Sequence, residues 1–401
     1  MRSNGPVGLW LIGAGGTLAT TAVVGARAIV RGLADRTGLV SDAPEFAALG
    51  LPALDRLRFG GHDIRAVNLA AAARTIAREN GSIREEWVGQ LEPDLAAVDS
   101  EIRPGQAQGS GGAIEAIADS THVVAANSAR ACVDEFSGQL RSFVQRHALE
   151  GLAVVNVAST EPPPTDPELL ADLDRLDRAL DAEPATAFRP GLLYAYAAMQ
   201  AGAAFVNFTA SPSCLCGAIE QLAKRKRVPY MGNDGKTGET LVKSGLAPMF
   251  RARRLEVMSW VGYNILGNRD GMVLADGDNK RSKIATKDSV LSNILGQPVR
   301  TRVGIDFVES LGDSKVAWDY IHFRGFLGHP MAMQFTWQGC DSILAAPLVL
   351  DLARFALLAL ERGESGAMTH LASFFKNPLQ SNDHDLYRQL AKLHAYAATA
   401  T

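Results

Sequence analysis

The chain has 401 residues, 47% of them hydrophobic and 21% charged, and its formal net charge is −3. So much apolar sequence can bury a large core and favours two domains, whereas a charge so close to zero predicts neither a nucleic-acid partner nor a disordered acidic tail. We find no signal peptide and no run of about 20 apolar residues that would span a bilayer, so we expect a cytoplasmic protein without a membrane partner.

The first part of the chain alternates between short apolar strands and helices. An apolar run at 7–12 is followed by a glycine-rich turn and by a helical pattern from Thr17 to about residue 33. Further strands are expected at 59–64, 152–157, 204–208 and 229–231, with helices at about 65–78, 84–96 and 127–148, two more before residue 204, and a loop at 102–113. This alternation predicts an α/β fold, a Rossmann-like doubly wound parallel sheet over residues 1–232.

The pattern changes after residue 232. Strands are expected at 256–265, 301–308, 316–323 and 331–337, with one helix among them at about 286–295. Runs of strands with few helices predict a mostly antiparallel or mixed sheet, which we assign to a second, α+β domain at 233–341. A long apolar helix from Asp341 to Glu361 is expected to return the chain to the first domain, which residues 342–401 complete.

The glycine-rich turn is the first candidate binding site. Gly13, Gly15 and Gly16 lie between a buried strand and a helix that starts at Thr17. Glycine lets the backbone approach a pyrophosphate, and the start of the helix offers free N–H groups, as in dinucleotide-binding proteins. A turn of this kind also occurs for packing alone, so both interpretations stay open. For the acid that binds the ribose of such a cofactor, Asp63 at the end of the next strand is a better candidate than Asp35.

The ends of two later strands carry small polar residues. Ser159 and Thr160 follow the strand at 152–157, and Ala210 and Ser211 follow the strand at 204–208. Ligands of open α/β sheets bind at the carboxyl ends of the strands. The alternative is that these residues cap the helices that follow, and both roles can hold at once.

A third candidate site precedes a helix at residues 232–240. This segment holds Thr237, Gly238, Glu239 and Thr240 directly after Lys236. Backbone N–H groups and hydroxyls at the start of a helix can cradle a phosphate, although the spacing does not match a P-loop. A plain helix-start turn is the alternative.

Lysines gather in and after the predicted second domain. Lys280, Lys283 and Lys287 lie in one short stretch, Lys315 follows Gly312-Asp313-Ser314, and Lys376 follows two phenylalanines. A lysine run is usually a solvated surface, which is the expected reading of Lys280 alone. A lysine beside other cations or in an apolar setting loses proton affinity and can act as an acid or base near neutral pH.

These motifs together resemble the myo-inositol-phosphate synthase family, and its archaeal and bacterial branch more than the longer eukaryotic one. The resemblance rests on five segments that occur in the family's order and spacing: 233–240, 263–271, 282–287, 312–315 and 374–376. It implies NAD as cofactor and D-glucose 6-phosphate as substrate. It also implies an isomerase that oxidises C5, enolises, joins C6 to C1 and reduces C5 again, to give 1L-myo-inositol 1-phosphate.

The resemblance also implies site residues, which are taken over position by position. The catalytic residues are Lys283, Lys287, Lys315, Lys376, Asp270 and Asp341. The substrate phosphate is assigned to Thr237, Gly238, Glu239, Thr240, Lys287 and Lys315. The cofactor is assigned to Gly13, Gly15, Gly16, Thr17, Asp63, Ser159, Thr160, Ala210, Ser211, Asp234, Asn268, Asp270 and Asp313.

The chain departs from the family at two cofactor positions. Thr17-Leu18 stands where many members have asparagines, and Ser159-Thr160-Glu161-Pro162 replaces Asn-Thr-Glu-Arg. The resemblance further implies a homotetramer built through the second sheet and, in prokaryotic relatives, a divalent metal ion whose ligands are not evident in the sequence. Two alternatives are an NAD-dependent cyclase or oxidoreductase acting on another phosphosugar, and an NAD-binding protein without turnover.

Overall fold

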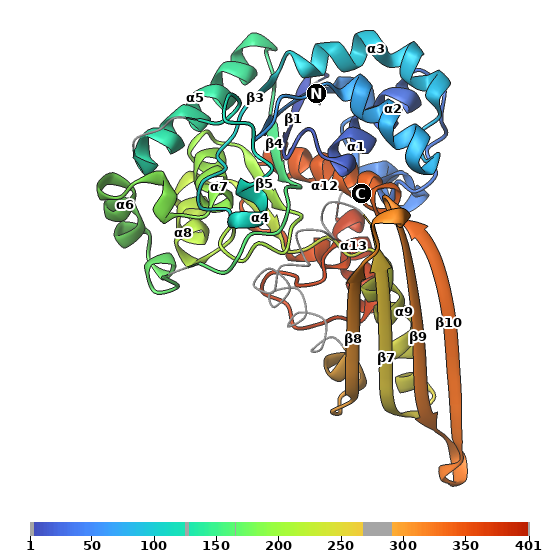
Figure 1. The fold of residues 1–401 in the computed structure, drawn as a ribbon. Helices are drawn as coiled ribbons and strands as arrows, with labels where there is room; N and C mark the ends of the chain where they lie inside the picture. Colours follow the sequence, from blue (N-terminus) through green and yellow to red (C-terminus); the bar gives the residue numbers. More distant parts are fainter. Residues whose placement is uncertain (1–3, 125–127, 165, 268–290, 400–401) are drawn as a thin grey trace.

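The computed structural model describes residues 4–124, 128–164, 166–267 and 291–399. These residues form two sheets of different character, and the second sheet projects away from the first as a long, narrow layer (Figure 1). Residues 291–295 are helical, as predicted, while the rest of the helix expected at about 286–295 lies outside the described residues.

The first sheet has seven strands, and every pair of neighbours is parallel. The spatial order is β11-β6-β5-β4-β1-β2-β3, so the strand order reverses between β1 and β4. Its strands are β1 (Val7–Ile12), β2 (Leu57–Asp63), β3 (Ile102–Pro104), β4 (Leu152–Asn156), β5 (Ala204–Asn207), β6 (Pro229–Gly232) and β11 (Gly366–Ala367). In such a sheet, ligands bind in the crevice beside the reversal, at the carboxyl ends of the strands.

Helices cover both faces of this sheet, as the sequence predicts. Side chains alternate along a strand, so Leu9 and Leu11 of β1 join one buried cluster while Trp10 and Ile12 join the other. The first cluster takes in α1 (Thr17–Val30), α2 (Leu69–Asn80), α3 (Glu85–Asp99), α12 (Asp341–Glu361) and α13 (Leu386–Ala398). The second takes in α5 (Ala129–Arg146), α6 (Leu173–Ala182), α7 (Pro190–Gln200) and α8 (Gly217–Lys226).

The second sheet is mixed, in the order β10-β9-β7-β8. β9 (Ser314–Arg324) is antiparallel to both β7 (Glu256–Leu266) and β10 (Pro330–Cys340), whereas β8 (Arg300–Phe307) is parallel to β7. The four predicted strands are confirmed. The helix α9 (Gly238–Ala252) packs on one face through Phe250, which shares a buried cluster with Trp260 and Ile321.

Three expectations differ from the structure. The expected loop at 102–113 begins with the three-residue strand β3 at the sheet edge, where a proline is tolerated because it needs no ladder partner on its outer side. It ends in the one-turn helix α4 (Gly112–Glu115), and the two-residue strand β11 was not predicted.

The limits of the two domains stay a prediction. The short 3-10 turns are η1 (Val40–Asp42), η2 (Pro44–Leu49), η3 (Leu54–Arg56), η4 (Leu169–Ala171), η5 (Ala185–Ala187), η6 (Glu309–Leu311), η7 (Phe326–Gly328) and η8 (Thr369–Phe374).

The third difference concerns α12. By length and hydropathy alone this helix is apolar enough to cross a membrane, so the expectation that no segment reaches that threshold is wrong. In the structure, 72% of its most apolar window is buried, against α1 and the strands β4, β5 and β6. The core helix of a doubly wound domain has the same composition as a spanning helix because both of its sides are covered.

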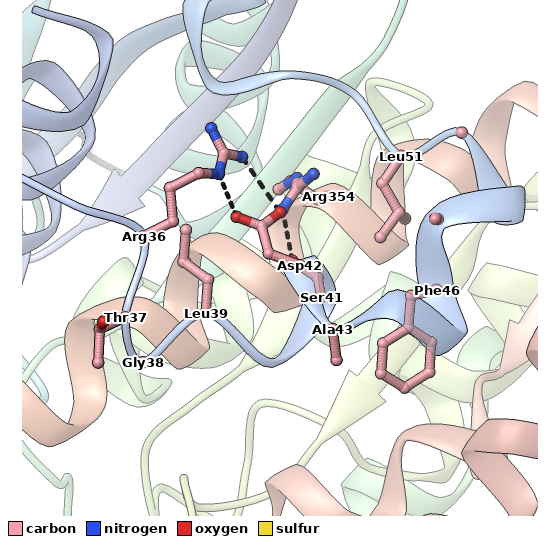
Figure 2. A pocket seen from close by; sticks show the side chains of 12 residues that line it. Arg36, Thr37, Gly38, Leu39, Ser41, Asp42, Ala43, Phe46, Leu51 and Arg354 are labelled. Atoms are coloured by element: carbon pink, nitrogen blue, oxygen red, sulfur yellow. Dashed lines mark hydrogen bonds and ion pairs between the residues drawn. The ribbon is translucent and has the colours of Figure 1, made fainter. Parts of the chain in front are cut away.

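The segment that follows α1 is fastened to α12 by buried charges. The carboxylate of Asp351 accepts hydrogen bonds from the backbone N–H groups of Val40 at 2.8 Å and Ser41 at 3.2 Å. Arg354 forms an ion pair with Asp42, with Nη1 2.8 Å from Oδ1, and its Nε donates to the carbonyl of Pro52 at 2.8 Å. Figure 2 shows Asp42 between Arg354 and Arg36, beside an open hollow of about 590 Å³. This network fixes the path of the chain between α1 and β2.

We predict that Asp351→Asn alters how stability depends on pH. Asp351 is fully buried, and burial raises the pKa of its carboxyl to about 6. In the unfolded chain the carboxyl of Asp351 has its ordinary pKa of about 4. Between about pH 4 and pH 6, Asp351 therefore keeps its proton in the folded protein and loses it in the unfolded chain, so the wild type loses stability as the pH rises through this range. Asparagine cannot ionise, so the unfolding free energy of the variant relative to the wild type should increase by about 2 kcal/mol between pH 4 and pH 7.

Urea denaturation of both proteins at the two pH values measures this difference. The exposed Asp174→Asn variant is the control, and it should show no comparable change. A difference between Asp351→Asn and the wild type that is the same at pH 4 and pH 7 would contradict the prediction.

Candidate active site

The glycine-rich turn closes tightly over the end of β2. The backbone N–H groups of Gly13 and Ala14 both donate to the carbonyl of His62, at 2.8 and 3.0 Å. Gly13 has a φ of +87°, and a Cβ placed on it would lie 2.9 Å from the Cα of Ala158, in the segment after β4. The N-cap of α1 is Gly16, which has no side chain to cap the helix that starts at Thr17. The first N–H groups of α1 are therefore available to an anion, which fits a dinucleotide pyrophosphate.

Asp63 lies beside this turn, where an acid for the ribose is expected. It is buried at the end of β2, and its Oδ2 accepts from the N–H of Gly15 at 2.7 Å. Its Oδ1 accepts from the N–H of Arg65 at 3.0 Å. A Cβ on Gly15 would lie 2.7 Å from Val67 Cγ2 and 3.1 Å from Asp63 Oδ2, so this contact requires glycine. The other candidate, Asp35, is exposed in the segment after α1.

The structure brings together the polar residues after β4 and β5. Thr160 and Ser211 are buried, and Ser159 and Ala210 are partly buried. The hydroxyl of Ser211 accepts from the N–H of Glu161 at 2.9 Å, which joins the two segments. With the glycine-rich turn next to Ala158, these residues lie after the carboxyl ends of the strands beside the reversal in strand order, where ligands of such sheets bind.

Glu161 is a buried acid that the sequence analysis did not select. Its Oε1 accepts from the N–H of Gly191 at 2.7 Å at the start of α7, and its Oε2 accepts no hydrogen bond from the described residues. Burial raises the pKa of this carboxyl to about 7. The sequence signal that could have identified Glu161 is its position between the end of a buried strand and the three prolines at 162–164.

Two distant segments meet at Asp234 and Lys376. Lys376 Nζ lies 2.7 Å from Asp234 Oδ1, with both side chains largely buried. The backbones also pair, because the N–H of Lys376 donates to the carbonyl of Asp234 at 2.7 Å and the N–H of Asn233 donates to the carbonyl of Asn377 at 2.8 Å. Asp234 Oδ2 is buried and accepts no hydrogen bond from the described residues. The ammonium of Lys376 is thus held in one place next to a carboxylate oxygen that has capacity for a ligand.

Lys315 belongs to β9, and its ammonium lies near the start of α9. Its Nζ is 3.3 Å from Oδ2 of Asp341, the first residue of α12. A Cβ placed on Gly238 would lie 3.4 Å from this Nζ, and Gly238 has a φ of +56°, which favours glycine. Thr237 is the N-cap of α9 and makes no capping hydrogen bond through its side chain. An ammonium and an open helix start therefore lie side by side, which is an arrangement that binds phosphate.

The segment 234–238 connects the two lysines. Asp234 holds Lys376 and Gly238 adjoins Lys315, and four residues of chain span at most about 14 Å. Two predicted catalytic lysines are thus brought to one region from positions 61 residues apart in sequence.

Other predicted residues have structural partners. Glu239 is buried and forms an ion pair with Lys243, and it accepts from Asn264 Nδ2 at 2.6 Å, so its carboxylate faces β7 and only its backbone N–H can serve a phosphate. Thr240 is buried one residue further along α9. Asp313 accepts from the thiol of Cys340 at 2.8 Å and from the hydroxyl of Ser342, at the junction of β10 and α12. Asn268, Asp270, Lys283 and Lys287 lie outside the described residues.

Neither of two other polar features coincides with the predicted site. No predicted catalytic or binding residue lines the hollow beside Arg36 and Arg354 (Figure 2). Lys236 is buried, donates to Gln389 of α13, and has its pKa lowered to about 8 by burial. Within the described ranges, no group of three or more His, Cys, Asp or Glu side chains gathers as a metal site, so no ligand set for the expected divalent ion is assigned.

Known protein sequences resemble this chain over nearly its whole length. The sequence model of a family described as myo-inositol-1-phosphate synthase matches residues 7–397. Inositol-3-phosphate synthase 1 of Bacteroides thetaiotaomicron is 32% identical over 96% of this chain and 94% of its own length. The synthases of Trypanosoma brucei brucei and Bos taurus are 30% and 31% identical over 74% and 80% of this chain, and the match spans 57% of each of those proteins.

Solved structures share the fold. An inositol-3-phosphate synthase of Caenorhabditis elegans superposes with a TM-score of 0.89 at 24% identity, covering 99% of this chain and 86% of that one. A myo-inositol-1-phosphate synthase-related protein of Thermotoga maritima gives a TM-score of 0.80 at 23% identity and covers 98% of both chains. These matches confirm the Rossmann-like domain with an appended mixed sheet.

We predict that removing only one partner of the Lys376–Asp234 ion pair is strongly destabilising in the absence of ligands. Asp234 and Lys376 expose only 7% and 12% of their side chains. Lys376→Met leaves a buried carboxylate without its cation and should lower the unfolding free energy by about 3–5 kcal/mol. The double variant Lys376→Met/Asp234→Asn removes that charge and should recover most of the loss.

Chemical denaturation of the two variants tests this prediction. Arg31→Met is the matched control, because the pair of Arg31 with Asp94 is exposed at the arginine and should cost less than about 1 kcal/mol. If Lys376→Met costs no more than this control, the buried carboxylate of Asp234 does not depend on Lys376 and the prediction is wrong.

Proposed function

The chain belongs to the myo-inositol-1-phosphate synthase family, and we propose that it converts D-glucose 6-phosphate to 1L-myo-inositol 1-phosphate without net redox change. It is an NAD-dependent isomerase of the inositol-3-phosphate synthase type. The observation that supports the proposed chemistry most strongly is that one short segment, 234–240, contacts two lysines. Its Asp234 pairs with Lys376, and its Gly238, at the start of α9, adjoins Lys315.

The dinucleotide site supports this proposal. The available N–H groups at the start of α1 suit the pyrophosphate, and the anchored carboxylate of Asp63 suits a ribose hydroxyl. NAD supplies reversible hydride transfer at C5 of the sugar. The segment after β5, which holds Ser211, is joined to the segment 234–238, because the carbonyl of Thr209 accepts from the N–H of Asp234 at 2.9 Å.

The lysines provide the charge that the reaction needs. The ammonium of Lys376 is held by Asp234 and can stabilise the negative charge that develops on the C1 oxygen when C6 attacks the aldehyde. The ammonium of Lys315 and the start of α9 can hold the phosphate, or Lys315 can stabilise the enolate. By resemblance, Lys283 exchanges the proton of the C5 hydroxyl and Lys287 assists at the phosphate.

We predict that the purified protein with NAD⁺ forms inositol phosphate from glucose 6-phosphate and accumulates no NADH. Lys315→Ala and Lys283→Ala should each lower kcat by about a hundredfold or more, because each removes a charge or proton carrier from the reacting sugar. Product is measured by chromatography and NADH by its absorbance. Lys224→Ala, on the exposed end of α8, is the control and should keep full activity.

The outcomes separate the alternatives. Net NADH formation, or turnover of a different phosphosugar in place of glucose 6-phosphate, would show another cyclase or oxidoreductase. NAD binding with no turnover of any phosphosugar would show a non-catalytic protein. Loss of activity with EDTA, reversed by added Mg²⁺, would support the divalent ion expected from prokaryotic relatives.

We further propose that four copies assemble through the second sheet. α9 covers one face of this sheet, and the other face carries large apolar side chains that stay exposed. Val261 lies opposite Tyr320 and Tyr263 lies opposite Trp318, and the rings of Tyr263 and Trp318 stack with centroids 5.1 Å apart. Exposed apolar surface of this extent marks an interface, and a second copy of the same sheet is the partner that the family resemblance implies.

This assembly gives a prediction for mass. We expect the wild type to run in light-scattering chromatography as a tetramer of the 42.7 kDa chain, and Trp318→Asp/Tyr320→Asp to run as a smaller species because it places charges on the apolar face. Val30→Asp changes an equally exposed apolar residue of α1 and should leave the mass unchanged. A monomeric wild type would refute the assembly.

A further inference from the structure

Trp337 carries a buried N–H group with no partner. It lies on β10, three residues before the strand ends, and its Nε1 is enclosed yet donates to no described residue. Buried tryptophan N–H groups in proteins normally have an acceptor, and one that lacks it needs an explanation such as a missing ligand.

The position of the indole is well defined. A Cβ placed on Gly339 would lie 2.4 Å from Trp337 Cζ3, so only glycine at that position leaves room for the ring. A Cβ placed on Gly238 would lie 3.1 Å from Trp337 Cζ2. The ring atoms nearest to this Cβ are Cζ2 and then Cη2 at 3.7 Å. In an indole, Cζ2 is bonded to the carbon that carries Nε1, so the N–H group lies one ring carbon away from the atom that approaches Gly238.

The surroundings of this part of the indole are those of an anion site. Lys315 Nζ would lie 3.4 Å from the same Cβ on Gly238, so the ammonium and the indole ring both adjoin Gly238. The N-terminus of α9 begins there without a side-chain cap. Two carboxylates are near, and both have cationic partners: Asp341 forms an ion pair with Lys315, and Glu239 forms one with Lys243.

We propose that Trp337 is a substrate-binding residue whose indole N–H donates a hydrogen bond to the phosphate group of the phosphosugar. Lys315 and the backbone N–H groups at the start of α9 supply the charge, and Trp337 supplies a neutral donor in a fixed direction. The identity of the phosphosugar rests on the proposed function, whereas the binding of a phosphate group at this place does not.

The role of Trp337 determines which kinetic constant it affects. The phosphate does not react, so its contacts are equally strong in the ground state and the transition state. Loss of the N–H should therefore raise KM for glucose 6-phosphate by about tenfold or more and leave kcat nearly unchanged. The affinity for NAD⁺ should not change, because the dinucleotide site lies at the end of the other sheet.

The experiment compares the wild type with Trp337→Phe in steady-state kinetics and in calorimetric titration with inorganic phosphate. We expect the variant to show the raised KM and an affinity for inorganic phosphate weakened by a similar factor. A second replacement, of Trp337 by β-(3-benzothienyl)alanine, exchanges N–H for sulfur at constant shape and covers the case in which Trp337→Phe fails to fold. Trp87→Phe on α3 is the control.

The outcomes keep the two proposals apart. If the wild type turns over glucose 6-phosphate and both replacements of Trp337 leave KM and phosphate affinity unchanged, this inference is wrong and the proposed function stands. If the wild type binds inorganic phosphate, loses that affinity on replacement of Trp337, and converts no glucose 6-phosphate, the binding role stands and the proposed function fails. A wild type that binds no phosphate overturns the inference.

Discussion

The ion pair between Lys376 and Asp234 is the contact on which the candidate site depends. It joins a turn at the end of β6 to a segment 142 residues further along the chain, and the two backbones pair on either side of it. A buried ion pair contributes little net stability compared with apolar packing, but it is costly to break from one side. Its role here is to fix the position of an ammonium group at the segment 234–238, which leads into α9.

The second sheet is inserted between these two segments, and α12 makes the return possible. Asp341 opens α12 at the site by pairing with Lys315, and the helix then passes through the core of the first domain to β11 and the segment before Lys376. A helix buried on nearly all sides has to be apolar, which is why its composition equals that of a membrane-spanning segment. Core packing in the first domain thus positions Lys376 and Asp341, and Asp341 pairs with Lys315 of β9. These are two of the lysines that we propose act on the substrate.

The elements that repeat a pattern were predictable from sequence. Periodicity located five of the seven parallel strands, the four strands of the second sheet and α12. The placement of Asp63 at a strand end identified its position beside the glycine-rich turn. Elements too short to show a period were not predictable, as β3 and β11 illustrate.

Side-chain direction also lay beyond the sequence. The carboxylate of Glu239 faces Lys243 rather than the phosphate turn, because a helical residue at the first turn can point to either the sheet or the ligand. Glu161 and Trp337 were missed because each is recognised by an atom without a partner, which only the packed structure reveals. The pairing of Asp234 with Lys376 spans too many residues for any local pattern to indicate it.

The fate of the hydrogen at C5 of the substrate tests the central claim most directly. The claim is that one active site oxidises, cyclises and reduces a single bound sugar with the same dinucleotide. With glucose 6-phosphate deuterated at C5 and unlabelled NAD⁺, mass spectrometry should find inositol phosphate that keeps the deuterium, and NAD that stays unlabelled in solution. Loss of deuterium from the product, or its appearance in free NADH, would contradict the account.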